Sequence, residues 1–169
     1  MHYHETLQEK SLEKTLERHI GKEKKETFLN FKLEFKLDKR LSDDTYLIGD
    51  LPLCRVLLMN VSNFPWVILV PRLQDKTELF QLSTSEQTDY QKETNYFLES
   101  MSTLYNSHKM NIASLGNLVS QLHTHVIVRF RHDDAWPNPV WSYKKMAKYN
   151  ETQSALEIDK IRKLVDDYD

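Results

Sequence analysis

Two histidines separated by one residue are the most chemically suggestive feature of the chain. His123 and His125 lie in the segment QLHTHVIVR, which starts at Gln121 and ends at Arg129. On a β-strand alternate side chains share a face, so these four polar side chains would form one row. Neutral imidazole is a nucleophile near pH 7, while amide and guanidinium groups donate hydrogen bonds to phosphate oxygens. The row therefore predicts a cradle for a phosphate group that a histidine attacks.

The same spacing permits two other interpretations. Paired histidines also occur without function on a solvated strand face, and the spacing alone favours that. A zinc site is the third interpretation, with His123 and His125 joined by His132, Asp133 or Asp134. No cysteine or suitably spaced third histidine completes such a set, so we expect no metal.

Strand-like segments surround the histidines. Residues 31–38 alternate apolar and charged side chains, which predicts a half-buried strand, with a helix start as the rival interpretation. Residues 52–60 and 66–71 are rich in β-branched and aliphatic side chains and are separated by a turn-like segment, which predicts a hairpin of central strands. Residues 110–114 and 118–131 complete the predicted strands.

Two segments have helical periodicity. Ser83 followed by Glu86 forms a capping box, and apolar residues then recur every three or four positions, which predicts a helix to about Ser107. We interpret its aromatic stripe as core. Residues 151–168 carry a second helical stripe, after an irregular segment that contains two prolines.

Length and composition indicate one domain. The 169 residues carry 23 basic and 25 acidic side chains, so no global field would attract nucleic acid or anionic lipid. The single cysteine, Cys54, lies in an apolar run and excludes a disulfide framework. Residues 1–28 lack the apolar segment of a signal peptide, and we expect them to form an extension of the domain. A thin stripe of apolar residues within them is typical of a marginal helix. These features favour a soluble cytoplasmic protein.

The histidine segment resembles the signature of the histidine triad (HIT) superfamily, in which three histidines alternate with hydrophobic residues on a strand. His123 matches the central histidine, which in that family forms a covalent nucleotidyl intermediate, and His125 matches the third. Gln121 stands in place of the first. The Gln-x-His-x-His pattern looks most like a bacterial subgroup of HIT hydrolases.

The resemblance extends over residues 31–142. CRVLLMNVSNFPWVILVPR is similar to the family's hairpin, which ends in Leu-Val-x-Pro-basic and precedes a long helix and the histidine strand. Gly116 and Asn117 match a turn glycine and a polar phosphate contact. Asn60 stands where the family often has an acidic residue that touches ribose, although a turn-forming Asn is an equal alternative. AWPNPVW is similar to the aromatic tail that follows the motif in some branches.

Other residues keep two interpretations. Arg129 would meet either phosphate or solvent. Trp136 and Trp141 would close over a base or fill a dimer contact. Two departures weaken the functional transfer, because Trp66 stands near the place of a further family histidine and Gln121 cannot shuttle a proton. We therefore expect binding to survive better than rate.

We expect an α+β domain of the HIT-like fold, with an antiparallel sheet of about five strands, one long helix packed on it and terminal helical extensions. Residues 1–28 would be the extension, residues 29–145 the nucleotide-binding domain and residues 146–169 a helical tail. The resemblance implies a homodimeric, metal-independent hydrolase or transferase that acts on the α-phosphate of a purine nucleotide derivative without a cofactor. The alternative is a non-catalytic nucleotide-binding or interaction module with a degenerate triad.

Overall fold

The computed structural model describes residues 35–168, and its centre is one antiparallel sheet of five strands in the order β1-β2-β3-β5-β4. Its strands are β1 (Thr45–Asp50), β2 (Cys54–Met59), β3 (Trp66–Pro71), β4 (Lys109–Ala113) and β5 (Thr124–Arg129). Three helices accompany them: α3 (Lys39–Asp44), α4 (Thr84–Tyr105) and α5 (Glu151–Asp166). Short 3₁₀ turns occur at Leu79–Gln81 and Val140–Ser142. The fold class predicted from the sequence is confirmed.

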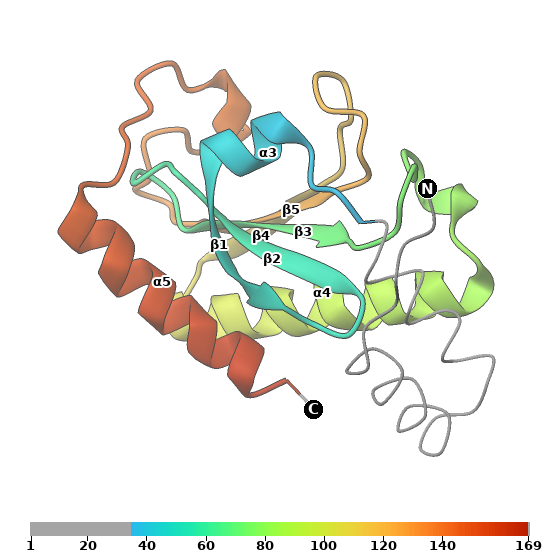
Figure 1. Ribbon diagram of the computed structural model, residues 1–169. Helices are drawn as coiled ribbons and strands as arrows, with labels where there is room; N and C mark the ends of the chain where they lie inside the picture. The colour runs from blue at the N-terminus through green and yellow to red at the C-terminus, as the bar shows by residue number, and fades with distance from the viewer. Residues whose placement is uncertain (1–34, 169) are drawn as a thin grey trace. The chain divides into compact units, whose positions relative to one another are not determined.

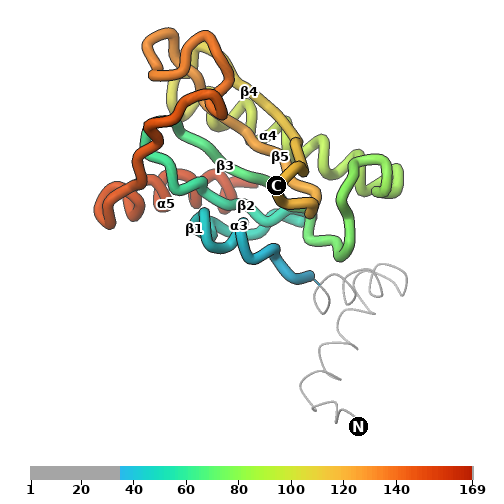
Figure 2. The backbone as a smooth tube through the Cα atoms, turned by 90° about the horizontal axis from the view of Figure 1, so that it is seen from above, coloured from blue at the N-terminus to red at the C-terminus, as the bar shows by residue number. Residues whose placement is uncertain are grey.

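The two helices α3 and α4 lie on opposite faces of the sheet (Figure 1). Seen from above, the strands follow one another from β1 to β4 in the stated order (Figure 2). Every residue of β3 and β5 is buried, because both faces of these two strands are covered. The histidine strand β5 pairs with β3 on one side and with β4 on the other.

Helix α4 forms where its sequence signals predict it. The Ser83 side chain accepts from the backbone N–H of Glu86, whose side chain accepts in turn from the Ser83 N–H. Asn106 ends the helix in the left-handed conformation. Tyr90 and Phe97 of the predicted stripe are buried in the core, and the Tyr90 hydroxyl donates to Thr124 Oγ1 over 2.7 Å. This bond joins the helix to the first residue of β5.

The strand predicted over residues 31–38 is wrong where the structure describes it. Residues 35–38 have no strand pairing, and α3 begins directly after them because the Asp38 carboxylate accepts from the Arg40 N–H. The first strand is β1 instead. Its alternation is interrupted by an irregularity between Leu47 and Gly49, and Leu47 is 55% exposed, so the sequence pattern did not reveal it.

Two further predictions differ in extent. The strand expected over residues 118–131 is confined to β5, because the chain forms a loop through residues 114–123 with Gly116 in the left-handed region at φ 69°. The helix expected over residues 151–168 is present as α5, which packs on β1 with Val165 against Gly49. The extension predicted for residues 1–28 lies outside the described residues, and the domain boundaries stay a prediction.

A buried carboxylate fixes the start of β2. Glu93 of α4 is 1% exposed, and its two oxygens accept from the backbone N–H groups of Leu53 and Cys54 over 2.7 and 2.8 Å. Burial raises the pKa of Glu93, while these hydrogen bonds lower it. The carboxylate therefore ties α4 to the hairpin that contains β2 and β3.

We expect Glu93→Ala to lower the free energy of unfolding by about 2–5 kcal/mol, because it leaves two buried N–H groups without an acceptor. Urea unfolding followed by circular dichroism measures this loss. Glu99→Ala removes an exposed carboxylate from the same helix and is the matched control, with an expected change within about 0.5 kcal/mol. Equal losses in the two variants would contradict the role of the Glu93 carboxylate.

Candidate functional site

The two histidines of the motif lie together at the start of β5. His125 is the second residue of the strand and His123 comes just before it. Their ring centroids are 4.8 Å apart, and the ring planes are nearly perpendicular at 82°. Both side chains are buried, at 5% and 8% exposure. The structure therefore brings together the pair that the sequence singled out.

Backbone geometry determines which nitrogen of His123 carries its proton. Nδ1 of His123 lies 2.6 Å from the carbonyl oxygen of Gln121. A carbonyl oxygen only accepts, so in this bond Nδ1 is the donor. In the neutral ring, Nε2 then keeps its lone pair. His123 therefore has a nucleophilic nitrogen at Nε2.

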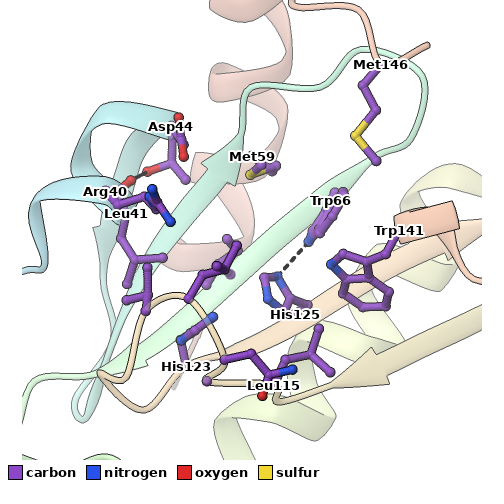
Figure 3. Close-up of a pocket in the computed structure, with 16 residues that line it drawn as sticks. Arg40, Leu41, Asp44, Met59, Trp66, Leu115, His123, His125, Trp141 and Met146 are labelled. Carbon is purple, nitrogen blue, oxygen red and sulfur yellow. Dashed lines mark hydrogen bonds between the residues drawn. The ribbon is translucent and has the colours of Figure 1, made fainter. Parts of the chain in front are cut away.

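His125 has the opposite tautomer, because its partner can only donate. The indole Nε1–H of Trp66 lies 3.0 Å from Nδ1 of His125 (Figure 3). Nδ1 must accept this bond, which leaves the ring proton of neutral His125 on Nε2. One imidazole thus has a lone pair at Nε2 and its neighbour has an N–H there.

Aromatic rings surround His125 on several sides. Trp66 and Trp141 contact it edge to face, with centroids at 5.3 and 5.4 Å. Burial, together with the nearby His123, lowers the pKa of His125 to about 3. His125 therefore stays neutral through the physiological range and acts as a hydrogen-bond donor without a charge.

Both histidines line a pocket of about 380 Å³. Trp66 and Trp141 lie beside them, and α3 contributes Arg40 and Asp44 to the pocket (Figure 3). The remaining lining residues are mostly apolar and come from α3, the start of β1, β2, β3, the loop of residues 115–119 and the tail near residue 146. A small polar centre with apolar walls suits a ligand that has one phosphate and one flat apolar group.

Two predicted binding residues and one predicted catalytic residue, Gln121, lie differently around this pocket. Gly116 and Asn117 line it, in the loop that precedes the histidines. Gln121 does not line it, because its Oε1 turns toward α3 and accepts from the backbone N–H of Asp38 over 2.9 Å. Gln121, which stands in the place of the first triad histidine, therefore holds the start of α3 with its side chain. Its backbone carbonyl accepts from His123.

Arg129 is outside the pocket, and the expectation that it meets phosphate or solvent is wrong. Its side chain is 1% exposed and forms a bidentate ion pair with Asp133. Its Nη1 donates to Asn111 Oδ1, and its Nη2 also donates to the Asn138 carbonyl. Four residues along a strand amount to about 13 Å, so Arg129 lies far along β5 from His125.

Asn60 and Trp136 are also outside the pocket. Asn60 Oδ1 accepts from the backbone N–H of Tyr149, which ties the tail to the end of β2. Trp136 packs against His108 and lies 5.8 Å from the Arg129 guanidinium. Of the two tail tryptophans considered for closing over a base, Trp141 is the one that lines the pocket.

The sequence did not reveal the role of Trp66. In the β3–β5 pairing Ile68 faces His125 directly, and Trp66 is the diagonal neighbour two residues along. Diagonal neighbours on one face are within reach of an aromatic side chain. The signal would have been an aromatic donor at the start of β3 once the pairing of β3 with β5 was known.

The alternative metal site does not form. Asp133 pairs with Arg129, and Asp134 accepts from Asn63. Among residues 35–168, no three His, Cys, Asp or Glu side chains come together in a way that could hold a metal ion. Within the same residues, each helix is too short or too polar to span a bilayer.

Fold and site together define an α+β domain in which two imidazoles of opposite tautomer lie beside a largely apolar pocket. The family model of the HIT domain matches residues 40–132, more than half of the chain. The chain belongs to the HIT, or histidine triad, family. It is thereby a member of a superfamily of nucleotide-binding hydrolases and transferases.

Solved structures of bacterial histidine triad proteins resemble the chain closely. The protein from Marinobacter aquaeolei is 43% identical, with a TM-score of 0.76, over 79% of this chain and 97% of that one. The protein from Bradyrhizobium japonicum is 38% identical, with a TM-score of 0.75, over 78% and 98%. The protein from Sinorhizobium meliloti is 40% identical, with a TM-score of 0.74, over 76% and 96%. A search of curated proteins found no match.

The lowered pKa of His125 predicts a pH dependence of stability. The unfolded chain binds a proton at this residue below about pH 6.5, whereas the folded chain does so only near pH 3. The free energy of unfolding should therefore fall by about 2 kcal/mol on this account between pH 7 and pH 5.

Urea unfolding at the two pH values, compared between the native chain and His125→Gln, isolates this part of the loss. The variant should lose about 2 kcal/mol less than the native chain over that range. His132→Gln, at an exposed position, serves as the control and should keep the native dependence. An unchanged dependence in His125→Gln would show that His125 titrates normally.

Proposed function

We propose that the chain hydrolyses or transfers nucleoside monophosphate derivatives through a covalent intermediate on His123. The observation that carries this proposal is the pair of opposite tautomers, which presents a lone pair and an N–H to the same pocket. In-line attack by Nε2 of His123 on the α-phosphorus would expel the leaving group, and water would then cleave the phosphorus–nitrogen bond. The leaving group would be an amine, a carboxylate or a nucleotide phosphate.

The residues around His123 support attack at phosphorus. Attack makes its imidazole cationic, and the Gln121 carbonyl that accepts from Nδ1–H stabilises that charge. The Nε2–H of His125 and the amide of Asn117 are donors for the phosphoryl oxygens as charge develops. The left-handed Gly116 lets the loop bring Asn117 to the pocket.

The remaining walls suit a purine nucleoside. Trp141, Met146 and Leu41 line the pocket beyond the histidines and provide apolar surface for a flat base. Gly116 and Asn117 are therefore proposed substrate-binding residues. Asn60, Arg129 and Trp136 lie outside this pocket and are not proposed to bind substrate there. A non-catalytic nucleotide-binding module is the alternative outcome of the test below.

We also propose that the protein works as a cytoplasmic homodimer. Within the described part of the chain β4 is an edge strand, so one side of its backbone is open to another strand. Ile112 of β4 and Leu104 of α4 are 51% and 40% exposed. Sedimentation of the purified chain at micromolar concentration should give a mass of twice 20.1 kDa, and a monomer would contradict this proposal.

The covalent step predicts a mass change on one residue. Rapid mixing with an adenosine 5′-phosphate derivative, followed by acid-free denaturation and intact-protein mass measurement, should reveal one added nucleotidyl group. His123→Ala should abolish the adduct and reduce turnover by about 10⁴-fold or more, because the nucleophile is removed.

His132→Ala is the matched control, since His132 is exposed and lies on the turn after β5. It should keep the adduct. Tight binding of adenosine monophosphate without any adduct in the native chain would favour the non-catalytic module. Turnover in His123→Ala equal to that of the native chain would remove His123 from the mechanism.

A further inference from the structure

The pocket contains few groups that could hand a proton to a departing atom. Its described lining includes no Lys, Tyr, Cys or Glu. The Thr45 hydroxyl donates to the Leu41 carbonyl, so its proton is already committed. Arg40 and Asp44 are the charged lining residues, and a guanidinium is too weak an acid whereas an ionised carboxylate only accepts.

Gln121 and His125, the neighbours of the nucleophile, also lack an acidic proton. Gln121 has its side chain on the Asp38 N–H, and an amide is no acid in any case. His125 would become an acid only by taking a proton on Nδ1, where the Trp66 N–H already points at 3.0 Å. Two N–H groups would then face each other, so protonation must break this hydrogen bond in a buried place.

The Trp66 indole therefore acts as a positioning residue. It holds Nδ1 of His125 as an acceptor and so keeps the Nε2–H directed to the pocket. The N–H of a neutral imidazole can donate a hydrogen bond to a phosphoryl oxygen, but it is too weak an acid to protonate a leaving group. His123 uses its own Nδ1–H on the Gln121 carbonyl, and its Nε2 is the attacking atom.

We propose that the pocket serves substrates whose leaving group departs as a stable anion, a carboxylate or a phosphate, in preference to substrates whose leaving group is an alkyl amine. This inference rests on the proposed function. It narrows that function to mixed anhydrides of a nucleoside monophosphate, either with an acyl group or with further phosphate.

The chemistry balances without a proton donor. Nε2 of His123 forms a bond to phosphorus while the bond from phosphorus to the leaving oxygen breaks, and that oxygen takes the electron pair as an anion. Water then attacks phosphorus, the phosphorus–nitrogen bond breaks, neutral imidazole is restored and one proton goes to solvent. An alkyl amine would depart as an amide anion unless it were protonated first, and no described pocket group supplies that proton.

A leaving-group series tests the proposal. Single-turnover release is measured at pH 7 for three derivatives of adenosine 5′-monophosphate: the 4-nitrophenyl ester, the phenyl ester and an N-alkyl phosphoramidate. The same three derivatives of guanosine 5′-monophosphate are measured in parallel. We expect the phenyl ester and the phosphoramidate to react at least about 100-fold more slowly than the nitrophenyl ester, since general acid help typically contributes that much.

The outcomes separate this inference from the proposed function. Comparable rates for all three derivatives, with the adduct on His123, would overturn the leaving-group preference and leave the proposed function standing. Absence of both turnover and adduct for every derivative would overturn the proposed function and this inference together. A steep decline in rate from the nitrophenyl ester to the phosphoramidate supports the proposal.

The role of Trp66 has a spectroscopic signature that packing alone would not change. In the native chain, the ¹⁵N shifts of His125 should show an unprotonated Nδ1 and a protonated Nε2, without titration between pH 5 and pH 8. Trp66→Phe keeps a ring but removes the donor, so the Nδ1–H tautomer or a titrating ring should appear. In Trp66→Phe, the ratio of the nitrophenyl ester rate to the phenyl ester rate should also become smaller at the acidic end of this pH range.

Trp141→Phe is the matched control, because Trp141 contacts His125 edge to face and no hydrogen bond joins the two residues. The tautomer of His125 should be unchanged in that variant. If Trp66→Phe fails to fold, the shifts of the native chain still decide. A protonated Nδ1 in native His125 would overturn the positioning role of Trp66.

Discussion

The hydrogen bond from the Trp66 indole to Nδ1 of His125 determines which ring nitrogen of His125 carries the proton. Indole has no acceptor, so the direction of this bond leaves no choice of tautomer. The Gln121 carbonyl imposes the reverse choice on His123. Two chemically identical side chains, with ring centroids 4.8 Å apart, therefore differ at Nε2, which is an acceptor in His123 and a donor in His125. The difference arises from their neighbours, one of them backbone and the other an aromatic side chain.

That arrangement needs β3 and β5 side by side, although residues 66 and 125 are 59 positions apart in the chain. Helix α4 and strand β4 fill the interval, and α4 is attached to β2 and β5, the two strands that flank β3. Tyr90 bonds to Thr124 at the start of β5, and Glu93 binds the backbone at the start of β2. These two anchors lie about one turn apart on the helix and hold α4 against the strands on either side of β3.

Local signals in the sequence were sufficient for several elements and for the position of the paired histidines. The capping box and spacing of α4, the hairpin of β2 and β3, and the paired histidines depend on neighbours close in sequence. The remainder depends on distant partners. Gln121 turns to Asp38, Arg129 finds Asp133 and Asn111, and β1 is hidden by its irregular pairing, so strand alternation alone gave the wrong surroundings for these residues.

The single thiol of the chain has a use that follows from the Glu93 anchor. Cys54 is fully buried at the start of β2, and burial together with the Glu93 carboxylate raises its pKa well above the ordinary value. An alkylating reagent can react with it only when the hairpin separates from α4. The rate of alkylation in native conditions therefore measures how often this part of the molecule opens, with a built-in reporter that needs no engineered label.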